Sequence, residues 1–358
     1  YAAVNLKENL FFYSGNPAMT IEPEYMTFRT PLYPLLLAAV YTFALNNWLV
    51  LALQNLLSVW NIMLARSMLF RFGYKPRYDW LLLLLVITWP AQFIHANTVE
   101  PEILLQSCVL LYVYQLLAFF KERKTRFAWG MSLALVGGLF VKPVLYPYTA
   151  LHLLLMLFLA FRQQTGLHRQ AQQLLTALLP VIAIISYNAW NASRTGKFHF
   201  TSNQSFNAIY YFYYYKSATE GIPAAQEFLR KERATMAAMP VFKDRYDYAN
   251  ERGKALLKEH MAGYIPYHLK HSMRFFVDPG KGDIDLFTGR LTYGRLYSDQ
   301  TRGFRAYIQE YGWWQGVIRF AGDQPSVWLA GVVFLFNLVK LVGLVLFAIN
   351  RRIPPGVR

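Results

Sequence analysis

The sequence is poor in charged residues and in cysteine. Charged residues make up 16% of its 358 positions, against roughly 25% in an ordinary soluble domain. This shortage argues against a soluble globular protein, because long stretches carry almost no charge. The single cysteine, Cys108, cannot form an internal disulfide. Because it lies in an apolar run, we interpret it as a small buried side chain.

Motifs that mark several common enzyme classes are also missing. The sequence contains no P-loop, no GxGxxG, no CxxC and no HExxH. It also contains no internal repeat and no low-complexity tract. These absences leave no motif evidence for a bound nucleotide or a zinc site. The sequence therefore requires no cofactor, although a divalent cation is compatible with it.

Hydrophobic residues account for 55% of the chain. About 20 mostly apolar residues cross the hydrocarbon core of a bilayer, which is roughly 30 Å thick. Several stretches meet or approach that length, and they predict an all-α polytopic membrane protein with seven spans. The predicted spans are Trp48–Phe70, Trp80–Ile94, Ile103–Phe120, Phe127–Val141, Leu145–Phe161, Leu174–Trp190 and Val327–Ile349.

The distribution of positive charge predicts how these spans are oriented. Lys and Arg number 36 against 20 Asp and Glu, which gives a net charge of +16. Basic segments alternate with turns that carry almost no charge, and basic loops favour the cytoplasm. The excess fits anionic lipids or a phosphate-bearing substrate better than nucleic acid. The basic segments are Arg66–Arg77, Lys121–Arg126, Arg162–Arg169 and Arg351–Arg358.

The segment Leu32–Leu45 is apolar but short for a span. We interpret it as a juxtamembrane or re-entrant helix on the outer face, and a true span is the alternative. The chain then divides into four parts. These are an outer loop with the juxtamembrane helix (1–47), a bundle of six spans (48–190), a mixed, mostly helical outer-face domain (191–326), and a last span with a basic tail (327–358).

The outer-face domain has its own sequence patterns. Ala224–Met239 and Tyr246–Met261 have helical, charged patterns, whereas Asp278–Gly282 reads as a turn. Arg290–Gly303 reads as an irregular loop. Tyr210–Tyr215 is an aromatic cluster, which predicts either a belt at the membrane interface or a surface that stacks on sugar rings.

Few ionisable residues lie at the predicted outer rim, where such residues are functional candidates. Glu100 and Glu102 either favour the start of a helix, or face an outer-leaflet cavity where they act on an acceptor or hold a metal. Lys142 and Arg29 are either surface cations that reach the interface or ligands of a phosphate. His95 shares the loop of the two carboxylates, which is a thin basis for a metal site.

Five short segments follow one another over residues 1 to about 280. They are YAAVNLKENLFF, FRTPLYPLLLA, WPAQFIHANTVEPEILL, GLFVKPVLYP and NAWNASRTGKFHFTSNQSFNAIYY. Through the order and spacing of these segments the chain resembles the GT-C type glycosyltransferases, the class that includes protein O-mannosyltransferases and lipid A aminoarabinose transferases.

The resemblance implies a GT-C-like transmembrane bundle in the cytoplasmic membrane of a bacterium, with its active site facing the periplasm. It implies transfer of a sugar, with inversion, from a polyprenyl-phosphate donor within the membrane lipids to a lipid, protein or glycan acceptor. Nucleic acid is not an expected partner. A non-catalytic subunit of a larger assembly, or a lipid or sugar transporter, is the alternative.

The resemblance also implies roles for individual residues. It assigns the role of catalytic acidic residue to Glu102, with Glu100 as the second choice. It assigns Lys142 and Arg29 to the phosphate of the donor. The family's first span and first-loop acid would lie before residue 1 of this sequence. Residues assigned to the substrate cavity are Tyr33, Asn203 and Arg194.

Overall fold

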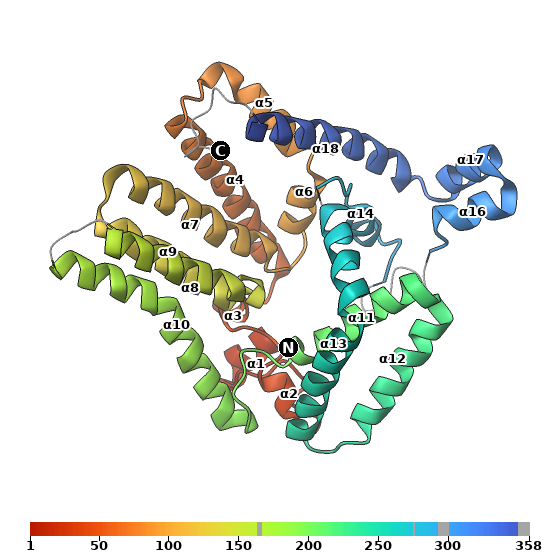
Figure 1. Ribbon diagram of the computed structural model, residues 1–358, viewed down its shortest axis with the longest axis horizontal. Coiled ribbons are helices and arrows are strands. Elements are labelled where there is room, and N and C mark those ends of the chain that lie inside the picture. The colour runs from red at the N-terminus through yellow and green to blue at the C-terminus, as the bar shows by residue number, and fades with distance from the viewer. Residues whose placement is uncertain (163–166, 275, 293–300, 350–358) are drawn as a thin grey trace. The chain divides into compact units, whose positions relative to one another are not determined.

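Helices make up all the regular structure that the computed structural model describes (Figure 1). The described residues are 1–162, 167–274, 276–292 and 301–349. Over these ranges the chain forms 17 α-helices and no strand. The predicted all-α class is therefore confirmed.

The chain divides into two compact units, which are described separately. Unit 1 comprises residues 1–73 and 99–264, and unit 2 comprises residues 74–98 and 265–358. Because these units group residues by contact and not by side of the membrane, the predicted four-part division stays a prediction. The helices of unit 1 are α1 (Ala2–Asn9), α2 (Pro23–Met26), α3 (Leu32–Phe43), α4 (Asn47–Arg71), α7 (Glu102–Glu122), α8 (Thr125–Val141), the turn η2 (Pro143–Leu145), α9 (Tyr146–Arg162), α10 (Leu167–Thr195), α11 (Asn203–Glu220), α12 (Ile222–Ala237) and most of α13 (Phe242–Arg274).

Unit 2 begins with the segment before α7 and continues from the end of α13. Besides the end of α13, its described helices are η1 (Pro76–Tyr78), α5 (Asp79–Ile87), α6 (Pro90–Ala96), α14 (Lys281–Phe287), α16 (Phe304–Tyr311), α17 (Trp313–Asp323) and α18 (Ser326–Ile349). The helices α16 and α17 pack on each other through aromatic rings. The ring centroids lie 5.1 Å apart for Phe304 and Phe320, and 5.4 Å apart for Tyr307 and Phe320.

Five described helices are long and apolar enough to cross a membrane, and they coincide with five of the predicted spans. Their exposed large side chains are mostly Leu, Val, Ile, Phe and Trp, as a lipid-facing surface requires. The chain is therefore a multi-pass helical membrane protein. The five candidates are Asn47–Arg71, Glu102–Glu122, Pro143–Phe161, Gln170–Thr195 and Ser326–Phe347.

Seven spans were predicted, and by length and composition the described residues contain five candidates, or up to six if a bent helix pair counts as one span. The stretch Trp80–Ile94 is not one helix, because α5 and α6 meet at an angle of 69°. Pro90 begins α6 and holds Trp89 outside the helical region, at φ −121° and ψ 81°. The other predicted span, Phe127–Val141, lies in the 17-residue helix α8. At 1.5 Å per residue α8 is about 26 Å long, which lies at the lower limit for a crossing, so this span stays a prediction.

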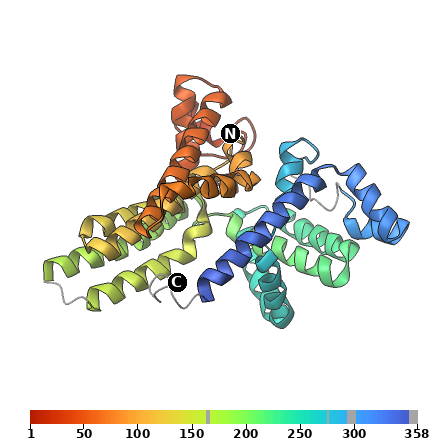
Figure 2. The ribbon, with the colours of Figure 1, turned by 90° about the horizontal axis from the view of Figure 1, so that it is seen from above.

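The core of unit 1 lies where α8 packs against α7 and α10 (Figures 1 and 2). Phe119, Met131 and Met156 are fully buried there. A buried polar group lies beside them, because the ring of His152 contacts the hydroxyls of Tyr112 and Ser132, at 3.1 Å each. Buried polar atoms are costly unless they pair in this way.

The helices α11, α12 and α13 carry most of the segment predicted to lie outside. Gly221 turns the chain between α11 and α12 at φ 94°, a conformation that favours glycine. The helices α12 and α13 confirm the predicted helices at Ala224–Met239 and Tyr246–Met261. Buried Glu232 ties them together by accepting hydrogen bonds from Tyr248 Oη at 2.7 Å and Arg252 Nε at 2.8 Å.

The predicted turn at Asp278–Gly282 is confirmed in its first part only. Asp278 Oδ1 accepts a hydrogen bond from the backbone N–H of Gly280 at 2.9 Å, and α14 begins at Lys281. Three other predicted segments lie wholly or partly outside the described residues. They are the loop Arg290–Gly303 and the basic segments Arg162–Arg169 and Arg351–Arg358.

Candidate functional site

A buried hydrogen bond joins two segments of unit 1 that the sequence separates widely. The hydroxyl of Thr30 donates to the carbonyl oxygen of Val141 at 2.8 Å. Both segments run into a proline, which keeps the residue before it from continuing a helix. Lys142 accordingly has extended backbone, at φ −156° and ψ 132°. Arg29 and Lys142 are each one residue away from this bond, so the two predicted phosphate ligands come from neighbouring segments.

Lys142 forms an ion pair with Glu102, and this brings together two more of the predicted site residues. Lys142 Nζ lies 2.6 Å from Glu102 Oε1. Glu102 is the first residue of α7, where the positive end of the helix dipole favours a carboxylate. Its side chain is 26% exposed, whereas that of Lys142 is 44% exposed. The pair is therefore partly open to solvent.

The second carboxylate oxygen of Glu102 is chemically different from the first. Oε2 is buried and accepts no hydrogen bond from any described residue. A buried acceptor without a partner costs about 1–3 kcal/mol. Glu102 therefore has one oxygen held by Lys142 and one oxygen that can accept a proton or a hydrogen bond from a ligand.

Tyr33 lies beside the two acidic residues of this site. Its hydroxyl donates to Gln54 Oε1 at 2.8 Å, and its side chain is buried. Burial raises the pKa of Tyr33 most, and the nearby Tyr41, Glu102 and Glu100 raise it further. Tyr33 is therefore a protonated hydrogen-bond donor at neutral pH, and Glu100 and Glu102 both act on it electrostatically.

The sequence interpretation missed the polar side chains of α4 that support this site. Gln54, Ser58 and Asn61 are buried and lie four and then three residues apart, so they share one face of the helix. Asn61 Nδ2 donates to the carbonyl oxygen of Ile103 at 3.2 Å and to Gln106 Oε1 at 2.9 Å. Polar residues at helical spacing in an apolar span were the signal that could have identified them.

Arg29 is exposed, and its guanidinium lies over the ring of Phe28, 5.1 Å from the centroid. Among the described residues it forms no ion pair. A guanidinium carries five N–H donors in a planar fork, which suits a phosphate or carboxylate. The donors of Arg29 are thus available to a ligand.

Asn203 and Arg194, two residues predicted to line a substrate cavity, lie in different surroundings. Asn203 Nδ2 donates to the carbonyl oxygen of Phe28 at 3.3 Å, and Asn203 lines an open cavity of about 580 Å³. Arg194 stacks on Trp190 at 3.5 Å and donates to Asn191 Oδ1 at 2.5 Å. Neither Arg194 nor Tyr33 lines the cavity of Asn203. Their contact with a substrate stays a prediction.

The loop after α10 is held by buried polar contacts. Asn191 Nδ2 donates to the carbonyl oxygens of His199 and Phe200 at 3.0 and 2.9 Å. His199 Nε2 lies 2.8 Å from Thr27 Oγ1. Burial lowers the pKa of His199 most, and the charge of Arg194 lowers it further, against the raising effect of a backbone hydrogen bond. His199 is therefore a neutral structural ring at neutral pH.

His95 lies on α6 and belongs to unit 2, so its proposed place in a cation site stays a prediction. The described geometry of unit 1 thus consists of Glu102, Lys142 and Tyr33, with Arg29 on the adjoining segment. Comparison of the chain with known protein families, with curated proteins and with solved structures finds no match.

Proposed function

We propose that this protein is a glycosyltransferase that moves a sugar from a polyprenyl-phosphate donor to an acceptor on the outer face of the membrane. The observation that carries the proposal is the Lys142–Glu102 ion pair, in which Glu102 keeps a second, unpartnered oxygen. The cation Lys142 and the potential base Glu102 are thus in contact, and the segment that carries Arg29 is adjacent to that of Lys142. Cleaving a sugar phosphate by attack of a hydroxyl requires both kinds of group.

In the proposed reaction, Glu102 removes the proton of the acceptor hydroxyl. The acceptor oxygen attacks the anomeric carbon as the bond from that carbon to the phosphate oxygen breaks. The electron pair leaves with polyprenyl phosphate, and Lys142 and Arg29 stabilise the added negative charge. Attack opposite the leaving group inverts the anomeric centre. Glu100, two residues before Glu102, is the second candidate for the base.

The ion pair supplies a way to link donor binding to activation of the base. Lys142 has a single ammonium group, for which Glu102 and the phosphate of the donor compete. When the phosphate takes Lys142, the carboxylate of Glu102 is released from the ion pair and is free to accept the proton of the acceptor hydroxyl. The exposed side chain of Arg29 offers the phosphate a second cation.

The remaining parts of the proposal follow from the sequence. The positive-inside distribution of Lys and Arg favours an active site on the outer, periplasmic side of a bacterial cytoplasmic membrane. The polyprenyl donor would lie among the membrane lipids. No metal ion is needed for the proposed step, and a divalent cation that bridges the phosphate remains compatible with it.

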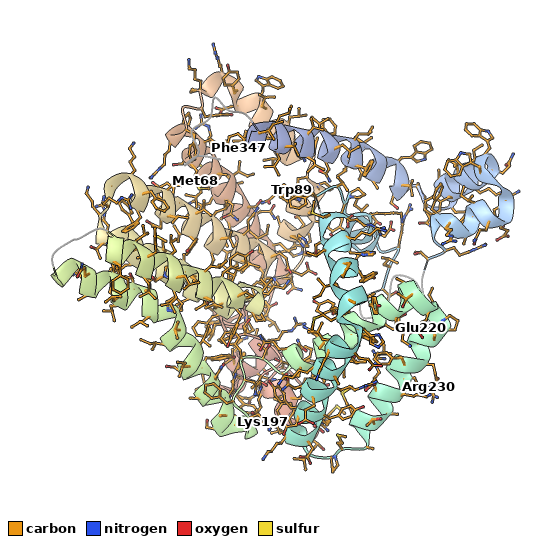
Figure 3. All side chains as sticks on the ribbon, viewed as in Figure 1. Met68, Trp89, Lys197, Glu220, Arg230 and Phe347 are labelled. Atoms are coloured by element: carbon orange, nitrogen blue, oxygen red, sulfur yellow. The ribbon has the colours of Figure 1, made fainter. Side chains whose placement is uncertain are left out.

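The test is an assay of sugar transfer in proteoliposomes. The full chain would be supplied with a panel of radiolabelled polyprenyl-phosphate sugars, and release of polyprenyl phosphate would be measured. We expect Glu102→Gln and Lys142→Gln to abolish release. Lys197→Gln is the matched control, because Lys197 pairs with Asp247 at 2.5 Å elsewhere in unit 1 (Figure 3). Wild-type rates in both site variants would overturn the proposal.

One observation favours transport as a second candidate function. The bent pair α5–α6 meets at 69°, and interrupted helices are typical of substrate sites in transporters. The same proteoliposomes distinguish the two functions. Accumulation of an intact polyprenyl-phosphate sugar in the opposite leaflet, without release of polyprenyl phosphate, would favour transport over transfer. A non-catalytic subunit would do neither.

A further inference from the structure

The open cavity of about 580 Å³ in unit 1 lies apart from the Glu102–Lys142 pair. Its walls come from the segment around α2, from the start of α11, from the end of α12 and from the start of α13. Neither Glu102 nor Lys142 contributes to them. The volume is within the range of about 300–1,000 Å³ that small-molecule sites occupy. The cavity is therefore large enough for a ligand of its own.

Aromatic rings form the apolar part of this cavity. Tyr25, Phe28, Phe206 and Tyr210 all line it. The rings of Tyr25 and Phe28 lie 5.9 Å apart, and the side chains of Tyr25 and Tyr210 are 40% and 37% exposed. Each ring offers a flat apolar face, and tyrosine adds a polar edge. Such surfaces suit a molecule that has both apolar faces and hydroxyl groups.

The charged groups of the cavity balance one another. Glu22 and Arg245 pair within the lining, at 2.7 Å between Oε2 and Nη2. The remaining charged side chains are Glu24 and Arg233, one of each sign, and Arg233 Nη2 donates to the Tyr210 hydroxyl at 3.2 Å. The lining thus has no net charge to select an ion. It does offer carboxylate, guanidinium and amide groups for hydrogen bonds.

The cavity is joined to the proposed catalytic site through one short stretch of chain. Phe28 lines the cavity, Arg29 stacks on Phe28, and Thr30 donates to Val141 next to Lys142. On the other side, Asn203 Nδ2 donates to the carbonyl oxygen of Phe28 at 3.3 Å. A ligand in the cavity therefore contacts Phe28, the neighbour of Arg29, and the Thr30–Val141 hydrogen bond links this stretch of chain to the segment of Lys142.

We infer that this cavity binds a saccharide and that the saccharide is the glycan acceptor of the transfer reaction. Pyranose rings combine apolar C–H faces with hydroxyls at their edges, which matches aromatic walls with neutral overall charge and several hydrogen-bonding groups. The assignment to the acceptor rests on the proposed function, whereas saccharide binding by the cavity does not.

Binding is tested by saturation-transfer NMR on the full chain in detergent, with tri- and tetrasaccharides of glucose, mannose and N-acetylglucosamine as probes. We expect Tyr210→Ala and Arg233→Ala to weaken binding about tenfold or more, which corresponds to about 1.4 kcal/mol. Because Arg233 is exposed, we expect its replacement to leave the fold intact. Tyr210→Phe keeps the ring and is expected to retain most of the affinity.

Matched controls lie on the same two helices. Tyr214 on α11 is 46% exposed and Arg230 on α12 pairs with Glu227, and neither lines the cavity (Figure 3 labels Arg230). Tyr214→Ala and Arg230→Ala are expected to bind like the wild type. Two results would overturn the inference that the cavity binds a saccharide. One is that no probe at a concentration of about 10 mM binds the wild type. The other is that both cavity variants bind as tightly as the controls.

The two proposals fail in different ways. Glu102→Gln is expected to bind the saccharide normally while it transfers no sugar. If Glu102→Gln and Lys142→Gln transfer sugar at the wild-type rate, the proposed function falls and the binding result stands by itself. If Arg233→Ala weakens binding but leaves the KM for the saccharide acceptor unchanged, the acceptor assignment is overturned.

Discussion

Replacing Glu102 by Gln separates a catalytic role of the Glu102–Lys142 pair from a purely structural one. At 2.6 Å two unit charges attract by on the order of 6 kcal/mol at an effective dielectric constant of about 20. Desolvation and lost side-chain freedom cancel most of this attraction. Because Lys142 is 44% exposed, we expect a net stabilisation nearer the surface value of about 1 kcal/mol.

A loss of about 1 kcal/mol hardly changes the folded fraction of a protein whose stability is about 5–15 kcal/mol. A structural pair therefore predicts nearly full activity in Glu102→Gln. A general base predicts a loss of about 10²–10⁴-fold in kcat. Release of polyprenyl phosphate and thermal unfolding in detergent, measured on the same preparation, give both quantities.

The charge-reversed double variant, Glu102→Lys with Lys142→Glu, sharpens the comparison. It keeps two opposite charges at the same two positions, so part of the pair's stability should return. Lys at the start of α7 costs about 0.3–1 kcal/mol against the helix dipole. Activity should stay lost, because base and phosphate ligand have exchanged places. Recovery of activity with stability in this variant would refute the reasoning, and so would a Glu102→Gln enzyme within about threefold of wild type.

Three further predictions concern stability. Burial lowers the pKa of His199 from its ordinary 6.5, so the unfolded chain binds more protons below that value and stability should fall as the pH drops through it; His199→Gln should flatten this profile in thermal unfolding. Burial raises the pKa of Glu24 above its ordinary 4.5. The stability that protonated Glu24 contributes should therefore be complete below pH 4.5 and lost as the pH rises through the raised pKa. A Glu24→Gln variant whose stability changes with pH in parallel with the wild type, from about pH 4 to about pH 7, would contradict this. His152→Leu leaves the hydroxyls of Tyr112 and Ser132 without their ring partner and should destabilise the protein by about 1–3 kcal/mol, measured by unfolding in detergent.

The spans were predictable because the length and apolarity of a helix are local properties of the sequence. Asn47–Arg71 and Ser326–Phe347 are long enough by themselves to cross the hydrocarbon core. The break at Trp89–Pro90 was also a local signal, since proline restricts the residue before it. The prediction of one span over Trp80–Ile94 missed this break because it considered only the hydrophobicity of the stretch. For α8, which has 17 residues, the predicted span stays a prediction, because its length lies at the lower limit for a crossing.

The candidate site could be predicted only as separate residues. Glu102 alone has the sequence signature of a helix start, and that is also where it lies. Lys142 alone reads as a cation at the membrane interface. Their ion pair joins positions 40 residues apart, and the Thr30–Val141 hydrogen bond joins positions 111 apart. Contacts at such separations depend on how helices pack, which no local pattern encodes.

The scarcity of charge by itself determined that this is a multi-pass helical membrane protein, because apolar helices of sufficient length have few other stable environments. Only the tertiary structure decided which of the few charged side chains meet. Packing of α7 against α8 brought Glu102 to Lys142, and the contact of the α2 segment with α11 closed one wall of the cavity around Asn203. The physical reason is that ion pairs and cavities are made by side chains from different helices.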